Sequence, residues 1–312
     1  MPVLIDDQGS FTELLVDDDV LRPFDGLLAL DRRRVTITGE FLTVPYDPAR
    51  GPLLPRVRVH SIQMEPAEGG LADLTVAGSQ PWVSILCRFG DAPAITPQPK
   101  SYFEALLLGN SYPGLDHYWR EASYGAVNLV GSAVVGWFDL PQPRSYYVYD
   151  RDGDGREDMD FGRAAEDCTG VADAQVFFPA FSGINLMFNE DLNGFAYGGR
   201  WTLTRDGETK QYAVTWMPTW GYGNQGALAH EMGHGFGLPH SSGPYSATYD
   251  SRWDVMSYAY ADCSPPVPTY GCVGTHTISF HKDRLGWIPP SRKYVAIPGR
   301  TDTISLERLA QP

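Results

Sequence analysis

The sequence predicts a mixed α/β fold, in which strands alternate with helices around one twisted sheet. Residues 82–89 form a continuous apolar run that is typical of a buried strand. Residues 101–108 and 115–122 carry apolar side chains at helical spacing, which predicts two helices. The turn pair Asp206-Gly207 lies between two apolar segments and predicts a β-hairpin.

The other elements follow along the chain. Short alternating segments before residue 78 predict strands, and later apolar segments predict further strands. One longer segment repeats apolar residues at helical intervals and predicts a helix. The predicted strands are 34–38, 56–60, 127–140, 184–188, 201–204 and 212–217, and the predicted helix is 162–181.

Three regions are expected. Residues 1–78 form a small β-rich region that carries no chemical motif. Residues 79–290 form the main domain, in which strands and helices alternate. Residues 291–312 contain two strand-like segments joined by Pro298-Gly299, and these either pack on the main domain or begin a further β-domain.

Composition excludes several classes of protein. Of the 312 residues, 43% are hydrophobic and 20% are charged, which favours a packed core over disorder. With 24 Lys and Arg against 38 Asp and Glu, the net charge of −14 disfavours binding to nucleic acids and to anionic membranes. No apolar run reaches the roughly 18 residues of a membrane-spanning helix. The first residues lack a signal-peptide pattern, so we expect either a cytosolic chain or one whose leader has been removed.

The chain contains four cysteines and no C-x-x-C pair, which argues against a cysteine zinc site. Cys263 and Cys272 lie nine residues apart in a Pro- and Gly-rich loop, and we predict a disulfide between them. Cys87 is either a buried thiol or the partner of Cys168. An even number of cysteines with one pair that can close locally favours an oxidising, extracellular compartment.

The strongest chemical signal is the motif H-E-x-x-H-x-x-G-x-x-H, which begins at His230. His230 and His234 lie four residues apart, so a helix presents both imidazoles on one face, where they can bind one zinc ion. Gly237 can adopt the left-handed conformation that ends a helix. His240 then supplies a third ligand after the chain turns back. Three protein ligands leave one position for water, which is the mark of a catalytic zinc site, and Glu231 is the expected general base.

A methionine turn follows the motif, at Asp254-Val255-Met256-Ser257-Tyr258. The two features together resemble the signature of the metzincin zinc endopeptidases. The resemblance implies a catalytic domain with a mixed twisted sheet, an active-site helix and an irregular C-terminal subdomain. It also implies that Met256 lies beneath the three imidazoles, and that Tyr258 binds zinc or donates a hydrogen bond to the oxyanion.

The segments around the motif resemble the secreted bacterial peptidases related to immune inhibitor A. The matching segments are 101–109, 118–125, 136–138 and 281–288. Those peptidases carry Asp as the third ligand, whereas this chain has His240. Gametolysin-like enzymes share the third His and the Leu-Gly-Trp segment. Residues 1–78 match neither group.

A second metal site is predicted in an acidic loop. Acidic residues occupy positions 1, 3, 5 and 9 of a calcium-loop pattern: Asp150, Asp152, Asp154 and Asp158. Gly155 stands at position 6, but Phe161 occupies position 12, where an EF-hand needs glutamate. The pattern therefore argues against a true EF-hand and leaves a looser calcium loop or a solvated acidic turn as alternatives.

The expected function is a secreted zinc endopeptidase that cleaves protein or peptide substrates, with Glu231 activating the zinc-bound water. The alternative is a catalytically silent, metzincin-like binding or adhesion module. The presence of Glu231 argues against that alternative, since a silent site needs no general base.

Overall fold

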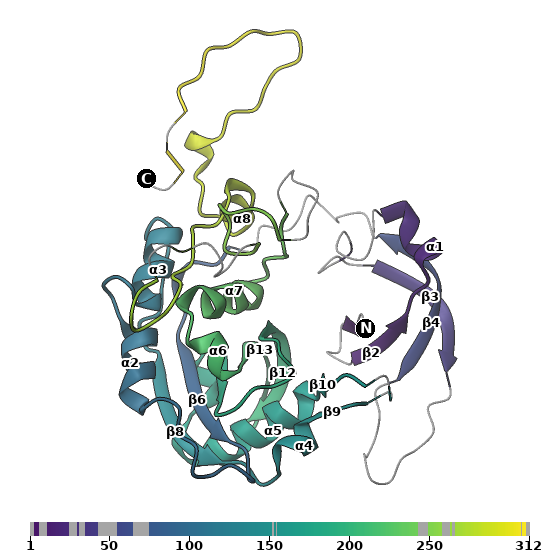
Figure 1. Ribbon diagram of the computed structural model, residues 1–312. Coiled ribbons are helices and arrows are strands. Elements are labelled where there is room, and N and C mark those ends of the chain that lie inside the picture. The colour runs from purple at the N-terminus through teal and green to yellow at the C-terminus, as the bar shows by residue number, and fades with distance from the viewer. Residues whose placement is uncertain are drawn as a thin grey trace. The chain divides into compact units, whose positions relative to one another are not determined.

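The chain contains two compact units, Met1–Ala72 and Asp73–Pro312 (Figure 1). The computed structural model describes residues 3–5, 11–24, 30, 35–42, 55–64, 75–151, 153, 155–242, 249–257, 263, 266–306 and 308–309.

The first unit is built on a four-stranded sheet with the order β1-β2-β4-β3. The strands are β1 (Val3–Ile5), β2 (Phe11–Leu15), β3 (Val35–Leu42) and β4 (Arg56–Met64). Between β2 and β3 the chain forms α1 (Asp18–Leu21), which contacts β4, and the 3₁₀ turn η1 (Arg22–Phe24). Val57 and Val59 alternate with exposed residues along β4 and pack with Leu14 and Ile62 in a small core. The predicted strands 34–38 and 56–60 are confirmed, and both extend further than predicted.

The second unit is built on a five-stranded sheet with the order β12-β13-β11-β6-β8. The strands are β6 (Trp82–Arg88), β8 (Ala133–Asp139), β11 (Gly183–Phe188), β12 (Tyr197–Arg205) and β13 (Glu208–Met217). All neighbours are parallel except the edge strand β12, which pairs antiparallel with β13. Asp206 and Gly207 both have positive φ, as a tight two-residue hairpin loop requires. The mixed α/β sheet and its hairpin are therefore confirmed.

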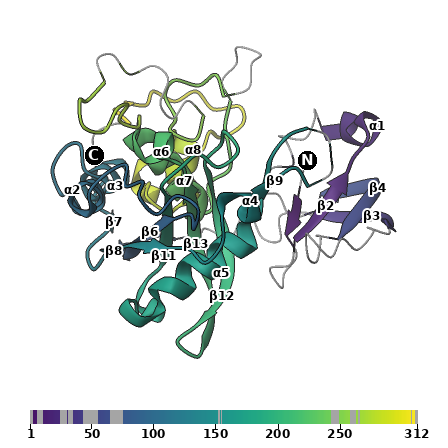
Figure 2. The same ribbon diagram turned by 60° about the horizontal axis from the view of Figure 1, so that its bottom comes forward.

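Helices cover both faces of this sheet (Figure 2). Side chains alternate along the buried strand β6, so Trp82 and Leu86 face one core while Val83 and Ile85 face the other. The helices are α2 (Lys100–Leu108), α3 (Leu115–Ala122), α4 (Arg144–Tyr147), α5 (Phe161–Ala172), α6 (Thr219–Tyr222), α7 (Gln225–Gly235) and α8 (Ser279–Arg284). Short pieces complete the unit: β5 (Gly78–Ser79), β7 (Val127–Asn128), β9 (Val148–Tyr149), β10 (Asp158–Met159), η3 (Asp173–Gln175), η4 (Phe178–Ala180) and η5 (Pro290–Arg292).

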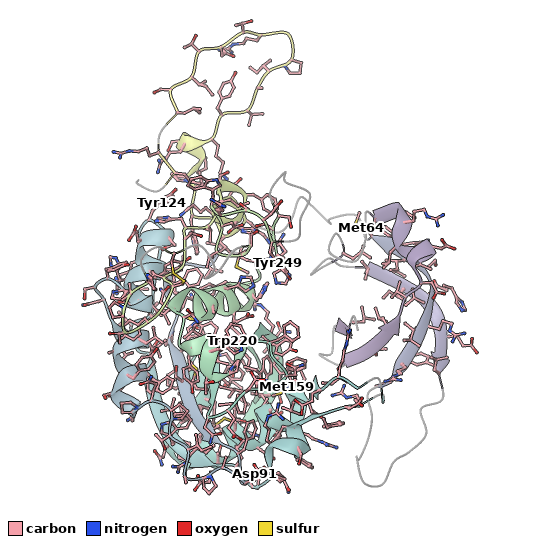
Figure 3. All side chains as sticks on the ribbon, in the orientation of Figure 1. Met64, Asp91, Tyr124, Met159, Trp220 and Tyr249 are labelled. Atoms are coloured by element: carbon pink, nitrogen blue, oxygen red, sulfur yellow. A yellow bond between two sulfur atoms is a disulfide. The ribbon has the colours of Figure 1, made fainter. Side chains whose placement is uncertain are left out.

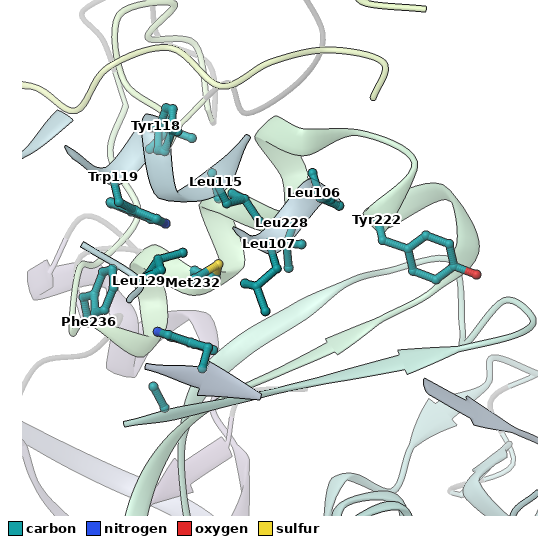
Figure 4. Close-up of a cluster of buried hydrophobic side chains, with 14 of the residues drawn as sticks. Leu106, Leu107, Leu115, Tyr118, Trp119, Leu129, Tyr222, Leu228, Met232 and Phe236 are labelled. Atoms are coloured by element: carbon teal, nitrogen blue, oxygen red, sulfur yellow. The ribbon is translucent and has the colours of Figure 1, made fainter. Parts of the chain in front are cut away.

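The core on the α7 side fixes the position of that helix. Leu228 and Met232 of α7 pack with apolar side chains of α2 and α3 (Figure 4). Trp119 of α3 also contacts Phe236, with their ring centroids 4.8 Å apart in an edge-to-face arrangement. The helix is therefore held between the sheet and two further helices, although it is only eleven residues long.

Two predicted elements are shorter than expected. The helix predicted over 162–181 ends at Ala172, and two 3₁₀ turns follow it. Pro179 has no amide hydrogen, so a continuous helix would lack a hydrogen bond at this position. The amide of Phe178, the residue before it, donates to Asp206 Oδ2 at 2.8 Å. The strand predicted over 127–140 is divided into β7 and β8, and Gly131 between them has a φ of 88°.

The prediction of two C-terminal strands is wrong. Residues 293–306 form neither helix nor strand, and Figure 1 shows them as a long loop beyond α8. Val295 is 81% exposed and Leu306 is 86% exposed. Two short strands that bury so little apolar surface are marginal by themselves, which accounts for the error.

Both possible disulfides are present. Cys87 of β6 is bonded to Cys168 of α5, with their Cα atoms 6.1 Å apart, so the alternative of a buried thiol is wrong. The predicted bond between Cys263 and Cys272 is confirmed, with a Cα separation of 5.4 Å. The first bond joins an interior strand of the sheet to the helix that covers it. None of the described helices has the length and apolar character needed to cross a membrane.

Lys282 of α8 is fully buried. Its Nζ donates to the carbonyl oxygen of Ala122 and lies 4.4 Å from the centroid of the Tyr124 ring. Burial lowers the pKa of Lys282 from 10.5 to about 8, although the negative charges of Glu121 and Asp254 act in the opposite direction.

This lowered pKa predicts a pH-dependent stability. Between pH 8 and 10 the unfolded chain keeps a proton on Lys282 that the folded chain has lost, so unfolding takes up a proton. The free energy of unfolding should therefore rise with pH in this window, by a contribution on the order of 2–3 kcal/mol. Urea unfolding at several pH values should show this rise in the native protein and not in Lys282→Met. Parallel curves for the two proteins would contradict the prediction.

Candidate metal centre

The helix α7 lies directly against the edge hairpin β12–β13 (Figure 1). At Gly198 of β12 a Cβ atom would lie 2.1 Å from the carbonyl oxygen of Glu231. Only glycine permits this approach of strand to helix. The strand consequently runs beside the turn of α7 that carries His230 and Glu231.

Gly237 ends the helix in the predicted manner. Its φ of 94° lies in the left-handed region. Its amide donates to the carbonyl oxygen of His234 at 2.9 Å, and the amide of Leu238 donates to that of Gly233 at 3.0 Å. These two bonds form a Schellman motif, which reverses the chain and directs it back past the helix. The reversal brings His240 beside the two histidines of α7.

The three imidazoles converge on one point. His234 Nε2 lies 3.1 Å from His230 Nε2 and 2.8 Å from His240 Nε2. Two nitrogens bound to one tetrahedral zinc ion at about 2.0–2.1 Å would lie about 3.3–3.4 Å apart. The observed separations are close to this value, so His230, His234 and His240 could hold a metal ion such as zinc.

Backbone carbonyls orient two of the rings. Nδ1 of His230 lies 2.7 Å from the carbonyl oxygen of Val255, and Nδ1 of His234 lies 2.8 Å from that of Leu238. Because a carbonyl oxygen only accepts, both Nδ1 atoms carry the hydrogen and both Nε2 atoms present a lone pair. These are the tautomers that bind a metal through Nε2.

Met256 packs against the helix at the ligand turn. It is fully buried, and a Cβ atom added to Gly233 would lie 2.4 Å from its Sδ atom. Gly233 immediately precedes His234. The methionine therefore supports the backbone of α7 at the ligands through packing.

Asp254 connects the segments around the centre. Its Oδ2 accepts from Ser241 Oγ at 2.5 Å, and its Oδ1 accepts from the amide of Met256 at 3.1 Å. Nδ1 of His281 in α8 lies 2.9 Å from the same Oδ2. Asp254 and His281 are almost completely buried. This carboxylate thus joins the residue after His240, the methionine turn and α8. His281 is isolated in the sequence, and no spacing pattern pointed to it.

The edge of the site beside β12 is acidic. Burial raises the pKa of Tyr197 to about 12, and the nearby carboxylates of Asp158 and Glu231 act in the same direction. The hydroxyl of Tyr197 donates to Asn193 Oδ1 at 2.9 Å. The phenol therefore stays protonated at neutral pH beside Glu231, which is itself largely buried.

A second residue that sequence reasoning missed is Tyr249, which Figure 3 labels near α7. Its Oη lies 3.0 Å from Nδ1 of His240 and 3.4 Å from Nε2 of the same ring. The two rings meet edge to face, with centroids 4.7 Å apart. Tyr258, which we predicted to act at the metal, lies outside the described residues.

The acidic loop is described in part. Asp152 and Asp154 lie outside the described residues. The side chain of Asp150 accepts hydrogen bonds from the amides of Gly153 and Gly155 at 2.7 and 3.1 Å. Asp158 of β10 stands opposite Tyr149 of β9 in an antiparallel strand pair. The loop thus closes a short hairpin, and calcium binding there stays a prediction.

No protein-family model matches the sequence, and no curated protein matches it either.

Proposed function

We propose that the protein is a secreted zinc endopeptidase of the metzincin type. The observation that carries the proposal is the convergence of three imidazole Nε2 atoms from the motif at His230, with Glu231 beside them on α7. The two disulfides support secretion, because such bonds persist mainly in oxidising compartments.

Zinc held by His230, His234 and His240 would supply a Lewis acid that polarises the scissile carbonyl and lowers the pKa of its bound water. Glu231 takes up the proton of the attacking water and later delivers it to the leaving amine. The carbonyls of Val255 and Leu238 keep two of the imidazoles in the binding tautomer throughout.

The buried surroundings of the ligands support this role. Met256 and Asp254 fix the backbone on either side of the imidazoles, so the three nitrogens are held in place before substrate binds. A preorganised site loses little free energy to rearrangement when the reaction occurs.

A direct test measures zinc content and casein cleavage together. We expect about one zinc per chain after dialysis, loss of cleavage on chelation, and recovery when zinc is restored. His234→Ala should bind little zinc and cleave no casein. His60→Ala, which removes an exposed histidine of β4, should match the native protein. Full activity without zinc or a replacement metal would overturn the proposal.

A further inference from the structure

The first turn of α7 is capped by backbone from a later part of the chain. An α-helix leaves its first amides without partners inside the helix, and the side chain before the helix commonly accepts from one of them. The residue before α7 is an asparagine, but its side chain makes no such bond. The amide of Gln225 instead donates to the carbonyl oxygen of Tyr270 at 2.9 Å. The amide of Gly226 donates to that of Cys272 at 2.8 Å. Residues 270–276, which we call the capping segment, therefore complete the N-terminus of the ligand helix.

The capping segment lies close against this end of α7. The amide of Cys272 donates to Asn224 Oδ1 at 3.2 Å. The amide of Gly274 donates to Gln225 Oε1 at 2.8 Å. A Cβ atom added to Gly271 would lie 2.4 Å from Asn224 Oδ1, so a larger residue would push the segment away. Hydrogen bonds thus run in both directions between the segment and the start of the helix.

The same segment supports the carbonyl that orients His230. The amide of Val255 donates to the carbonyl oxygen of His276 at 3.1 Å, and the carbonyl oxygen of Val255 lies 2.7 Å from Nδ1 of His230. Tyr118 of α3 holds the preceding residue, since its hydroxyl donates to the carbonyl oxygen of Thr275 at 2.6 Å. The capping segment therefore reaches His230 by two routes, through the first turn of α7 and through the methionine turn.

The two disulfides differ in their exposure and in their relation to α7. Cys272 belongs to the capping segment, and both it and its partner Cys263 are partly exposed. Cys87 and Cys168 are completely buried, in the core on the face of the sheet opposite to α7. Reduction by a thiol begins when a thiolate attacks a sulfur atom of the disulfide, so it requires access to that atom. A reductant in solution should therefore open the bond between Cys263 and Cys272 first.

We propose that the disulfide between Cys263 and Cys272 is a redox-sensitive clamp that holds the capping segment on α7 and so keeps His230 in place for metal binding. Residues 273–278 form neither helix nor strand, so the bond restrains a segment without regular structure. A dithiol opens the clamp: it gives up two hydrogen atoms and closes to its own disulfide, while Cys263 and Cys272 each become a thiol. The first turn of α7 then frays, and the affinity for metal falls. The inference rests on the proposed metal site.

The test is the affinity for zinc, measured by competition with a chromophoric chelator at a temperature where circular dichroism shows every protein to be folded. Cys263→Ala with Cys272→Ala removes the clamp, and we expect it to weaken zinc binding by about 10- to 100-fold. Cys87→Ala with Cys168→Ala is the control. It removes the longer cross-link, on the opposite face of the sheet, and should leave the affinity unchanged. This control separates the position of the ligands from stability in general.

A second pair of variants keeps both disulfides. Gly271→Ala places a methyl group against Asn224 and displaces the capping segment, so it should also weaken zinc binding. Gly299→Ala is the matched control, because Gly299 has positive φ as well, but an added Cβ would have no heavy atom within 4 Å. Its affinity for zinc should equal that of the native protein.

Reduction of the native protein tests the redox step. After treatment with dithiothreitol and alkylation, mass spectrometry should find Cys263 and Cys272 labelled before Cys87 and Cys168. The affinity, measured once the dithiothreitol has been removed, should fall as in the clamp variant and return on reoxidation. Earlier labelling of the buried pair would overturn the inference.

The affinities of the variants decide the rest. An unchanged affinity in Cys263→Ala with Cys272→Ala would overturn the inference, and so would an equal loss in Cys87→Ala with Cys168→Ala. If the native protein binds zinc but cleaves no peptide, the proposed function fails while the affinities still decide this inference. If the native protein binds no zinc, both fail.

Discussion

Replacing Glu231 by glutamine should lower kcat for peptide hydrolysis by a factor on the order of 10²–10⁴ while zinc stays bound. Glutamine has nearly the same shape as glutamate, so α7 and its contact with Gly198 should be preserved. The amide has no basic oxygen that can take up the proton of the attacking water. The loss should therefore appear in kcat far more than in zinc content.

The measurement is the rate of cleavage of a quenched fluorescent peptide, with zinc determined in the same samples. Glu104→Gln on α2 is the matched control, because Glu104 forms an ion pair with Lys100 on the helix surface. Its rate should equal that of the native protein. A Glu231→Gln protein that cleaves at the native rate would remove Glu231 from the mechanism. Zinc binding without any cleavage by the native protein would favour the silent binding module.

Removing the bond between Cys87 and Cys168 should cost the largest share of stability. The two cysteines are 81 residues apart, and the chain-entropy model for a loop of this length gives about 4–5 kcal/mol. The bond between Cys263 and Cys272 closes a separation of nine residues, for which the same model gives about 2–3 kcal/mol. A longer loop restricts the unfolded chain more, so the first bond should contribute more.

Urea unfolding of two double variants measures this difference. Cys87→Ala with Cys168→Ala should lose more unfolding free energy than Cys263→Ala with Cys272→Ala, each compared with the native protein. The second variant is the control for loss of a disulfide as such. The reverse order would show that the entropy of the unfolded chain does not dominate.

Much of the ligand geometry could be predicted because its signals are local. The spacing of His230 and His234 is a property of any α-helix, and Gly237 stops the helix because glycine tolerates positive φ. The hairpin across Asp206-Gly207 follows from the same conformational preference. In each case the relevant residues lie within a few positions of one another.

The supporting contacts could not be predicted because no spacing rule relates their residues to the ligands. Tyr249 contacts His240 from nine residues further along the chain, and His281 approaches Asp254 because α8 packs on the domain. The same limit applies to the C-terminal loop. The alternation of apolar residues in this loop is typical of strands. A strand, however, needs a neighbouring strand to pair with and a core to pack on, and residues 293–306 have neither among the described residues.

The contacts of Asp254 bear on the order in which the site forms during synthesis. The ribosome releases the chain from its amino end, so Glu231 and the three histidines emerge well before His281. Until α8 emerges, the carboxylate of Asp254 lacks one of its buried partners. Because domains fold as units, we expect the metal centre to become rigid only when nearly all of Asp73–Pro312 has been made. A nascent chain would then carry the complete motif that begins at His230 for some time before the three imidazoles are held in place.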